Sequence, residues 1–174
     1  MREDELFGRL EGGDLSALDE LVRAYYPDIL RYCRRHTPDA SSAEDAAQET
    51  FLKAVRHLDA YVHSRKFRAW LYRIAANTCV DFWRRSQSTE PLTDGEYLDP
   101  GFERAELSCD LRSALAALPP AQREVVLLRY VHGLKLRECA EVLDVPLRTV
   151  QSRERAALKA LKKAAEAALA YMNT

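Results

Sequence analysis

An interruption near the middle of the chain most constrains its fold. On either side of it, helix-forming Ala, Leu, Arg and Glu dominate, and apolar residues recur at intervals of three and four. Residues 86–106, SQSTEPLTDGEYLDPGFERAE, instead contain two prolines, two glycines, several acids and little apolar periodicity, which is typical of a linker. We therefore predict an all-α protein of two small helical domains, residues 1–86 and 107–174, joined by an acidic flexible linker, residues 87–106.

Charge is distributed unevenly along the 174 residues, although the net charge is only −1. Residues 1–86 carry 14 basic and 14 acidic side chains, residues 87–108 carry one basic and six acidic, and residues 109–174 carry 11 basic and 7 acidic. Such asymmetry is a better guide to partners than the total charge. The C-terminal domain is thus basic and the linker acidic, and composition alone does not decide between a nucleic-acid partner and a solvated basic face for this domain.

Several classes of protein are disfavoured by what the sequence lacks. The cysteines at 33, 79, 109 and 139 are far apart and form no CxxC pair, so we expect neither a disulfide framework nor a metal site. Free cysteines, a charged N-terminus and the lack of an apolar run of about 18 residues predict a cytoplasmic protein without membrane insertion. No catalytic Ser-His-Asp order or phosphate-binding glycine loop is present, so we predict neither an enzyme nor a cofactor.

The first domain should contain at least three helices. Asp14 can cap a helix that runs to about residue 35, and Pro27 should kink or break it. Ser41 or Ser42 can cap the next helix, in which we expect Phe51 to be largely core. A third helix should cover residues 67–85.

The C-terminal domain contains the sharper signal. Residues 135–143 have helical spacing, residues 144–146 (Asp-Val-Pro) break it, and a second, basic helix begins at about residue 147. Two helices joined by a tight turn are the arrangement of a helix-turn-helix, whose second helix enters the major groove of DNA. A solvated basic face on a bundle helix is the alternative. The residues expected to point inward from the second helix are Val150, Ala157, Leu158 and Leu161.

The helix at 67–85 combines packing and binding residues. Phe67, Trp70, Leu71, Ile74, Thr78 and Phe82 form a strip at helical spacing, and for any one aromatic here core packing is the default. Basic residues and further aromatics lie off this strip and in the loop before it. Basic groups interleaved with aromatics suit a single strand with unstacked bases.

Three stretches together resemble a known family: DAAQETFLKAVRHLDAY, FRAWLYRIAANTCVDFWRR and LPPAQREVVLLRYVHGLKLRECAEVLDVPLRTVQSRERAAL. They are similar to the group IV, or extracytoplasmic-function (ECF), sigma factors of bacterial RNA polymerase, in the sigma-70 family. The resemblance implies that residues 1–86 are sigma region 2 and residues 107–174 are sigma region 4. It also implies three partners: the polymerase core enzyme, promoter DNA as duplex and melted strand, and an anti-sigma factor.

The resemblance assigns three sets of site residues. Those expected to bind the core polymerase are Asp45, Gln48 and Glu49. Those expected to melt and capture the −10 element are Tyr61, His63, Lys66, Arg68, Trp70, Tyr72, Arg73, Asn77, Asp81, Arg84 and Arg85. Those expected to read the −35 element are Arg148, Thr149, Gln151, Ser152, Arg153, Arg155 and Lys159. Family members often have Gly-Thr-Val-Lys-Ser-Arg at 148–153, so Arg148 and Gln151 are departures.

Two questions stay open at this point. The C-terminal half alone also resembles the helix-turn-helix of stand-alone transcriptional regulators, in which case the N-terminal domain would sense a ligand or partner. The acidic linker could occupy a basic polymerase channel built for RNA, or it could remain a solvated tether.

Overall fold

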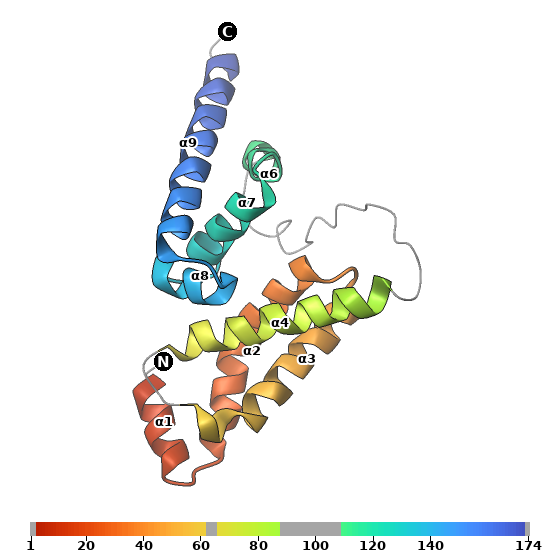
Figure 1. Ribbon diagram of the computed structural model, residues 1–174, viewed down its shortest axis with the longest axis vertical. Helices are drawn as coiled ribbons and strands as arrows, with labels where there is room; N and C mark the ends of the chain where they lie inside the picture. Colours follow the sequence, from red (N-terminus) through yellow and green to blue (C-terminus); the bar gives the residue numbers. More distant parts are fainter. Residues whose placement is uncertain (1–2, 62–65, 88–108, 173–174) are drawn as a thin grey trace. The chain divides into compact units, whose positions relative to one another are not determined.

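The computed structural model describes residues 3–61, 66–87 and 109–172 (Figure 1). These residues form helices, turns and short connections without any strand, which confirms the predicted all-α class. The chain divides into two compact units, residues 1–99 and residues 100–174. Apart from Gln87, the predicted linker lies outside the described residues.

Unit 1 is a bundle built on three long helices, α2 (Ser16–His36), α3 (Ala40–Arg56) and α4 (Phe67–Gln87), each of which packs on the other two. The short helix α1 (Glu3–Glu11) packs on α2, and a 3-10 turn, η1 (Leu58–Ala60), follows α3. Leu21, Ile29 and Leu71 are among its fully buried side chains. Phe51 is buried as expected.

Aspartate carboxylates accept backbone N–H groups in the first turns of α2 and α3. Asp14, which the sequence predicted as the cap of α2, precedes the N-cap residue Leu15 and accepts the backbone N–H of Ser16 at 3.0 Å. The cap of α3 is Asp39, whose extended backbone lets its carboxylate accept the N–H of Ser42 at 2.8 Å. The prediction of Ser41 or Ser42 as this cap was wrong, because both already lie within the helix. The hydrogen bonds from Ser42 lower the pKa of Asp39.

Helix α2 continues through Pro27 without a break, contrary to the alternative that proline would end it. Proline cannot donate the helical hydrogen bond, but Pro27 is exposed, so water can satisfy the carbonyl that loses its partner. Tyr25 and Ile29 are buried on the two sides of Pro27. Tertiary packing therefore holds the helix on both sides of the proline.

Unit 2 contains α6 (Cys109–Ala116), α7 (Pro120–Val126), α8 (Leu136–Leu143) and the long α9 (Leu147–Met172). After α7 the chain continues as a wider π-helical turn, η2 (Leu127–Val131), and α6, α7 and α8 all pack on α9. The Arg123 guanidinium donates to the carbonyls of Leu115 and Leu118, at 3.0 and 3.1 Å. It thereby adds side-chain hydrogen bonds to carbonyl groups at the end of α6.

The predicted helix-turn-helix is present as α8, a three-residue turn and α9. Asp144 adopts a left-handed conformation, with φ 51° and ψ 46°, which stops α8. At the other end of α8, Glu138 accepts the backbone N–H of Lys135 at 2.6 Å. In α9, Val150 and Ala157 are buried as expected, but Leu158 is 42% exposed and its inward assignment was wrong.

Candidate nucleic-acid and protein interfaces

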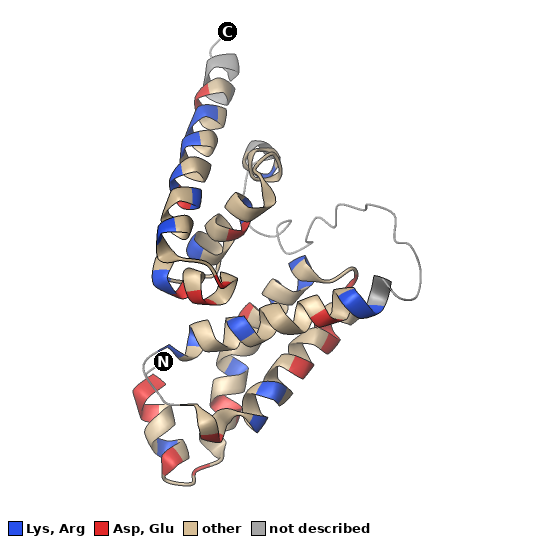
Figure 2. Ribbon diagram, viewed as in Figure 1, with Lys and Arg blue, Asp and Glu red and all other residues tan. Residues whose placement is uncertain are grey.

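One side of α9 is exposed and basic. Arg148, Gln151, Ser152, Arg155 and Lys159 are all exposed, and their spacing of three and four residues places them on the same side. Figure 2 shows Lys and Arg recurring along this helix. The spacing also adds Lys162 and Lys163, both exposed, to this side. We call these seven residues the α9 face.

Two of the residues predicted for DNA reading lie off this face. Thr149 and Arg153 are partly buried and lie toward the side of α9 that packs on the rest of unit 2. The nearby Glu154 is also directed away from the face. It accepts a hydrogen bond from the Tyr130 hydroxyl at 3.0 Å and lies 3.8 Å from the Arg129 guanidinium. From Arg148 to Lys159 the α9 face is therefore free of acidic side chains, and farther along the helix exposed Glu166 lies 3.8 Å from the Lys162 ammonium.

A second exposed stripe runs along α4. Arg73, Asn77, Val80 and Arg84 are exposed and follow one another at intervals of four, three and four residues. This spacing places the Asn77 amide between two guanidinium groups on one face. Sequence reasoning missed Val80, which is 47% exposed. Val80 is not a member of the apolar strip predicted for this helix, and this could have indicated its exposure.

Two of the three aromatics predicted to meet a captured strand belong to a cluster of rings. Tyr61 and Trp70 lie with their ring centroids 4.7 Å apart, and Phe67 lies within 5.6 Å of both. Tyr61 and Trp70 each keep part of their surface exposed, whereas Phe67 is buried. Lys66 and Arg85 are exposed at the two ends of α4, and His63 lies outside the described residues.

Tyr72 has no exposed surface, so its assignment as a DNA contact was wrong. Its ring meets that of Tyr32 edge-on at 5.4 Å, and burial raises the pKa of its hydroxyl. The apolar strip of α4 did not predict the burial of Tyr72, because the strip marks one side of the helix whereas both α2 and α3 pack on α4. The buried arc of the helix is consequently wider than the strip, and it includes Tyr72 and Cys79.

Arg68 is engaged inside unit 1. Its guanidinium lies 2.9 Å from a carboxylate oxygen of Asp28 on α2, and each side chain is only about one-third exposed, at 35% and 30%. An arginine held in this way is a link between α2 and α4. Its position does not support the predicted contact with DNA.

A third surface lies on α3. Asp45 and Gln48 are exposed and Glu49 is partly exposed, as expected for a polar stripe. Leu52 and Val55 share this side of the helix and are 53% and 42% exposed. Sequence reasoning missed both, since apolar residues in a helix are usually assigned to the core.

Lys53 links α3 to α4. Its ammonium lies 3.7 Å from Glu49, 3.4 Å from Asp81 and 3.3 Å from the Thr78 hydroxyl. Asp81, predicted to contact the −10 strand, is therefore paired with a lysine where α3 packs on α4.

The described residues contain neither a membrane-spanning helix nor a cluster of metal ligands. None of the helices there is long and apolar enough to cross a membrane. No group of three or more His, Cys, Asp and Glu side chains in that part of the chain could hold a metal ion.

Comparison with known proteins identifies both units. Residues 21–89 match the family described as Sigma-70 region 2, and residues 110–161 match Sigma-70, region 4. The first match removes the support for a stand-alone regulator with an N-terminal sensing domain.

Relatives match along nearly the whole chain. The ECF RNA polymerase sigma factor SigW of Bacillus subtilis is 33% identical over 172 residues, which cover 89% of this chain and 92% of SigW. The RNA polymerase sigma-H factor of Pseudomonas aeruginosa is 33% identical, over 94% of this chain and 93% of that protein. Among solved structures, CnrH in complex with the cytosolic domain of CnrY is similar with a TM-score of 0.66 and 26% identity, over 93% of this chain and 96% of CnrH. The chain belongs to the ECF sigma factors of RNA polymerase, within the sigma-70 family.

Proposed function

We propose that this sigma factor directs the polymerase core to specific promoters by a division of labour between its two units, without chemistry of its own. Residues 1–86 act as region 2, which docks on the polymerase and melts and captures the −10 element. Residues 107–174 act as region 4, which reads the −35 element as duplex. Residues 87–106 form the tether between them.

The observation that carries this proposal is the α9 face. Lys159 lies 11 positions after Arg148, or about 16 Å along the helix at about 1.5 Å per residue. The B-DNA major groove is about 12 Å wide and admits one α-helix. Arginine can donate two hydrogen bonds to guanine and glutamine can pair with adenine, which suits Arg148 and Gln151 for reading bases. Lys159, Lys162 and Lys163 are suited to phosphate contacts.

The stripe on α4 suits a separated strand. An exposed amide offers one donor and one acceptor to the edge of an unpaired base, and a duplex does not present that edge. Arg73 and Arg84 on either side of Asn77 can bind the backbone phosphates of the same strand. The partly exposed rings of Tyr61 and Trp70 provide surfaces for stacking.

The α3 surface suits a protein partner. Carboxylates beside exposed Leu52 and Val55 combine charge steering with apolar contact, as interfaces between proteins do. We assign Asp45, Gln48 and Glu49 to the polymerase core. CnrH was solved with the cytosolic domain of CnrY, and we infer that an anti-sigma factor likewise binds this chain in the cytoplasm.

The test is transcription in vitro by core polymerase, with and without the protein, on genomic DNA. Mapped start sites should share upstream elements at −35 and −10. Arg148→Ala should relax discrimination at one −35 position by about 5- to 150-fold, the equivalent of about 1–3 kcal/mol. Lys159→Ala should weaken binding to all −35 sequences alike, and should reduce the slope of log affinity against log salt concentration by about one.

Asn77→Ala tests the other unit. It should impair opening of the −10 element while leaving binding to the −35 duplex intact. Arg23→Ala removes an exposed charge from α2, outside all three surfaces, and serves as the control. Tight binding of isolated protein to intact duplex, with initiation by the core unaffected, would refute the proposal.

A further inference from the structure

The first helix lies outside the residues assigned by family comparison. The match to Sigma-70 region 2 begins at residue 21, whereas α1 covers Glu3–Glu11. Its apolar side is nevertheless buried, with Leu6 and Phe7 only 5% and 6% exposed. The first helix is thus part of the core of unit 1.

Phe7 contacts the ring cluster described above. Its ring centroid lies 5.5 Å from that of Tyr61 and 5.1 Å from that of Phe67. Phe67 in turn contacts Trp70 at 5.5 Å and Tyr25 of α2 at 5.4 Å. Phe7 therefore supports Tyr61 directly and Trp70 through one intervening ring. Packed aromatic rings in offset or edge-on contact restrict one another's orientation.

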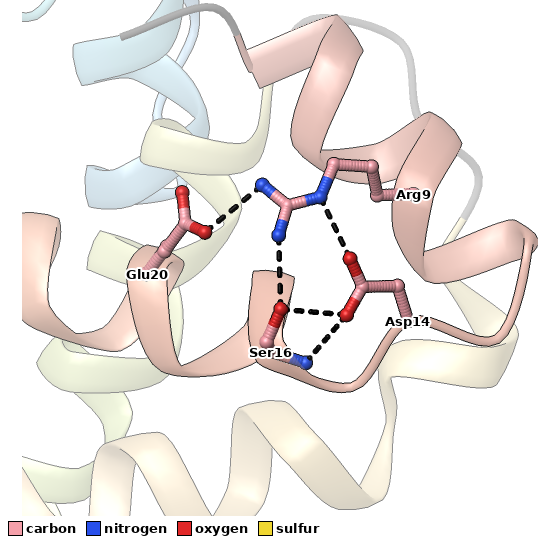
Figure 3. Close-up of polar contacts among 4 residues, drawn as sticks. All are labelled: Arg9, Asp14, Ser16 and Glu20. Carbon is pink, nitrogen blue, oxygen red and sulfur yellow. Dashed lines mark hydrogen bonds and ion pairs between the residues drawn. The ribbon is translucent and has the colours of Figure 1, made fainter.

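Polar contacts fix α1 to the beginning of α2. Figure 3 shows the Arg9 guanidinium between three side chains, with Asp14 at 2.8 Å, the Ser16 hydroxyl at 2.9 Å and Glu20 at 2.9 Å. At the other end of α1, Glu3 accepts a hydrogen bond from the Tyr25 hydroxyl. Because α1 is held to α2 at both ends, the position of Phe7 between those ends is fixed relative to α2.

We propose that α1 is a positioning element for capture of the melted −10 strand. Through Phe7 it holds Tyr61 and Trp70 in the orientation that stacks on unpaired bases. The inference rests on the proposed function, because it requires these two rings to meet the strand. Its ligand is single-stranded DNA, and Phe7 itself, being buried, does not touch it. Rings held in place before binding lose less conformational freedom when the strand arrives.

The experiment compares two DNA probes bound by holoenzyme. One is a −35 duplex that ends in a single-stranded non-template −10 segment, and the other is the −35 duplex alone. For Phe7→Ala we expect an approximately tenfold loss of affinity for the forked probe, because stacking on aromatic rings carries effects of about this size per base. Affinity for the duplex probe and for core polymerase should stay within about twofold of wild type.

Other variants separate positioning from folding. Phe7→Leu keeps an apolar group under Tyr61 and should recover part of the loss, and Arg9→Ala should lose forked-probe affinity in the same direction by loosening α1. Leu15→Ala is the matched control in the turn before α2, since Leu15 is 75% exposed. Circular dichroism checks that each variant is folded.

Two results would overturn the inference. The inference would be wrong if the Phe7→Ala and Arg9→Ala variants folded and bound the forked probe with wild-type affinity. The proposed function would not be affected by that result. Wild-type holoenzyme that bound the forked probe no better than the duplex would overturn the proposed function as well.

Discussion

The ion pair between Arg68 and Asp28 decides whether Arg68 is a structural residue or a contact for DNA. A charge-assisted hydrogen bond contributes about 1.5–3 kcal/mol to stability, whereas an exposed ion pair contributes about 0–1 kcal/mol. Both side chains here are about one-third exposed, so solvent screening reduces the expected value to about 1 kcal/mol. Losing the pair should lower the unfolding midpoint of a unit of this size by about 4–8 °C.

A double-mutant cycle can measure this coupling. Arg68→Met keeps most of the apolar stem and removes the charge, and Asp28→Asn removes the carboxylate. The protein has two tryptophans, Trp70 and Trp83, and both lie in unit 1. Tryptophan fluorescence during urea unfolding therefore reports on unit 1 without interference from unit 2. We expect a coupling free energy of about 1 kcal/mol and similar losses of stability from each single substitution.

The same variants test contact with DNA. If Arg68 is structural, Arg68→Met should leave the salt dependence of forked-probe binding unchanged. The alternative outcome has two parts. The stability losses of the two single substitutions would add in the double variant, and Arg68→Met alone would lower the slope of log affinity against log salt concentration by about one, which would show that Arg68 binds a phosphate. That result would refute the structural assignment and restore the one made from the sequence.

Three further predictions follow from local geometry and pKa shifts. Asp144→Gly should stabilise the helix-turn-helix by about 0.5–1 kcal/mol, because glycine adopts the left-handed conformation without strain; slower hydrogen exchange in α8 would show it, and unchanged exchange would contradict it. Hydrogen bonds from Ser16 and Arg9 lower the pKa of Asp14 below its unfolded value. Its contribution to stability is therefore complete above about pH 4 and is lost as the pH falls through the folded pKa, so Asp14→Asn should flatten this part of the pH profile of unit 1 unfolding. Burial raises the pKa of Cys139 to about 12, so at pH 8 iodoacetamide should alkylate Cys139 only after unfolding, as measured by mass spectrometry.

Local features were readable from the sequence. The helix-turn-helix was predicted to within one residue at the start of α8, because proline and a change of periodicity mark its turn. Five of the seven residues of the α9 face were predicted, because a helix with a single buried side must expose the opposite one. The cap of α3 was misplaced by two or three residues because Asp39, Ser41 and Ser42 are all good capping residues, and only the backbone conformation selects among them.

The sequence by itself determined the long helical segments, the turn of the helix-turn-helix and the basic character of α9, because these properties depend on residues within a few positions of one another. Tertiary structure alone decided how much of each helix is covered. It buried Tyr72 and paired Arg68 with Asp28 because two helices pack on α4, and it left Leu52 and Val55 exposed because no described helix covers that side of α3. It also brought Phe7 against Tyr61 and Phe67, which lie more than 50 positions away in the chain. Such contacts arise only when separate helices assemble, and helical periodicity contains no information about which neighbour will cover which side.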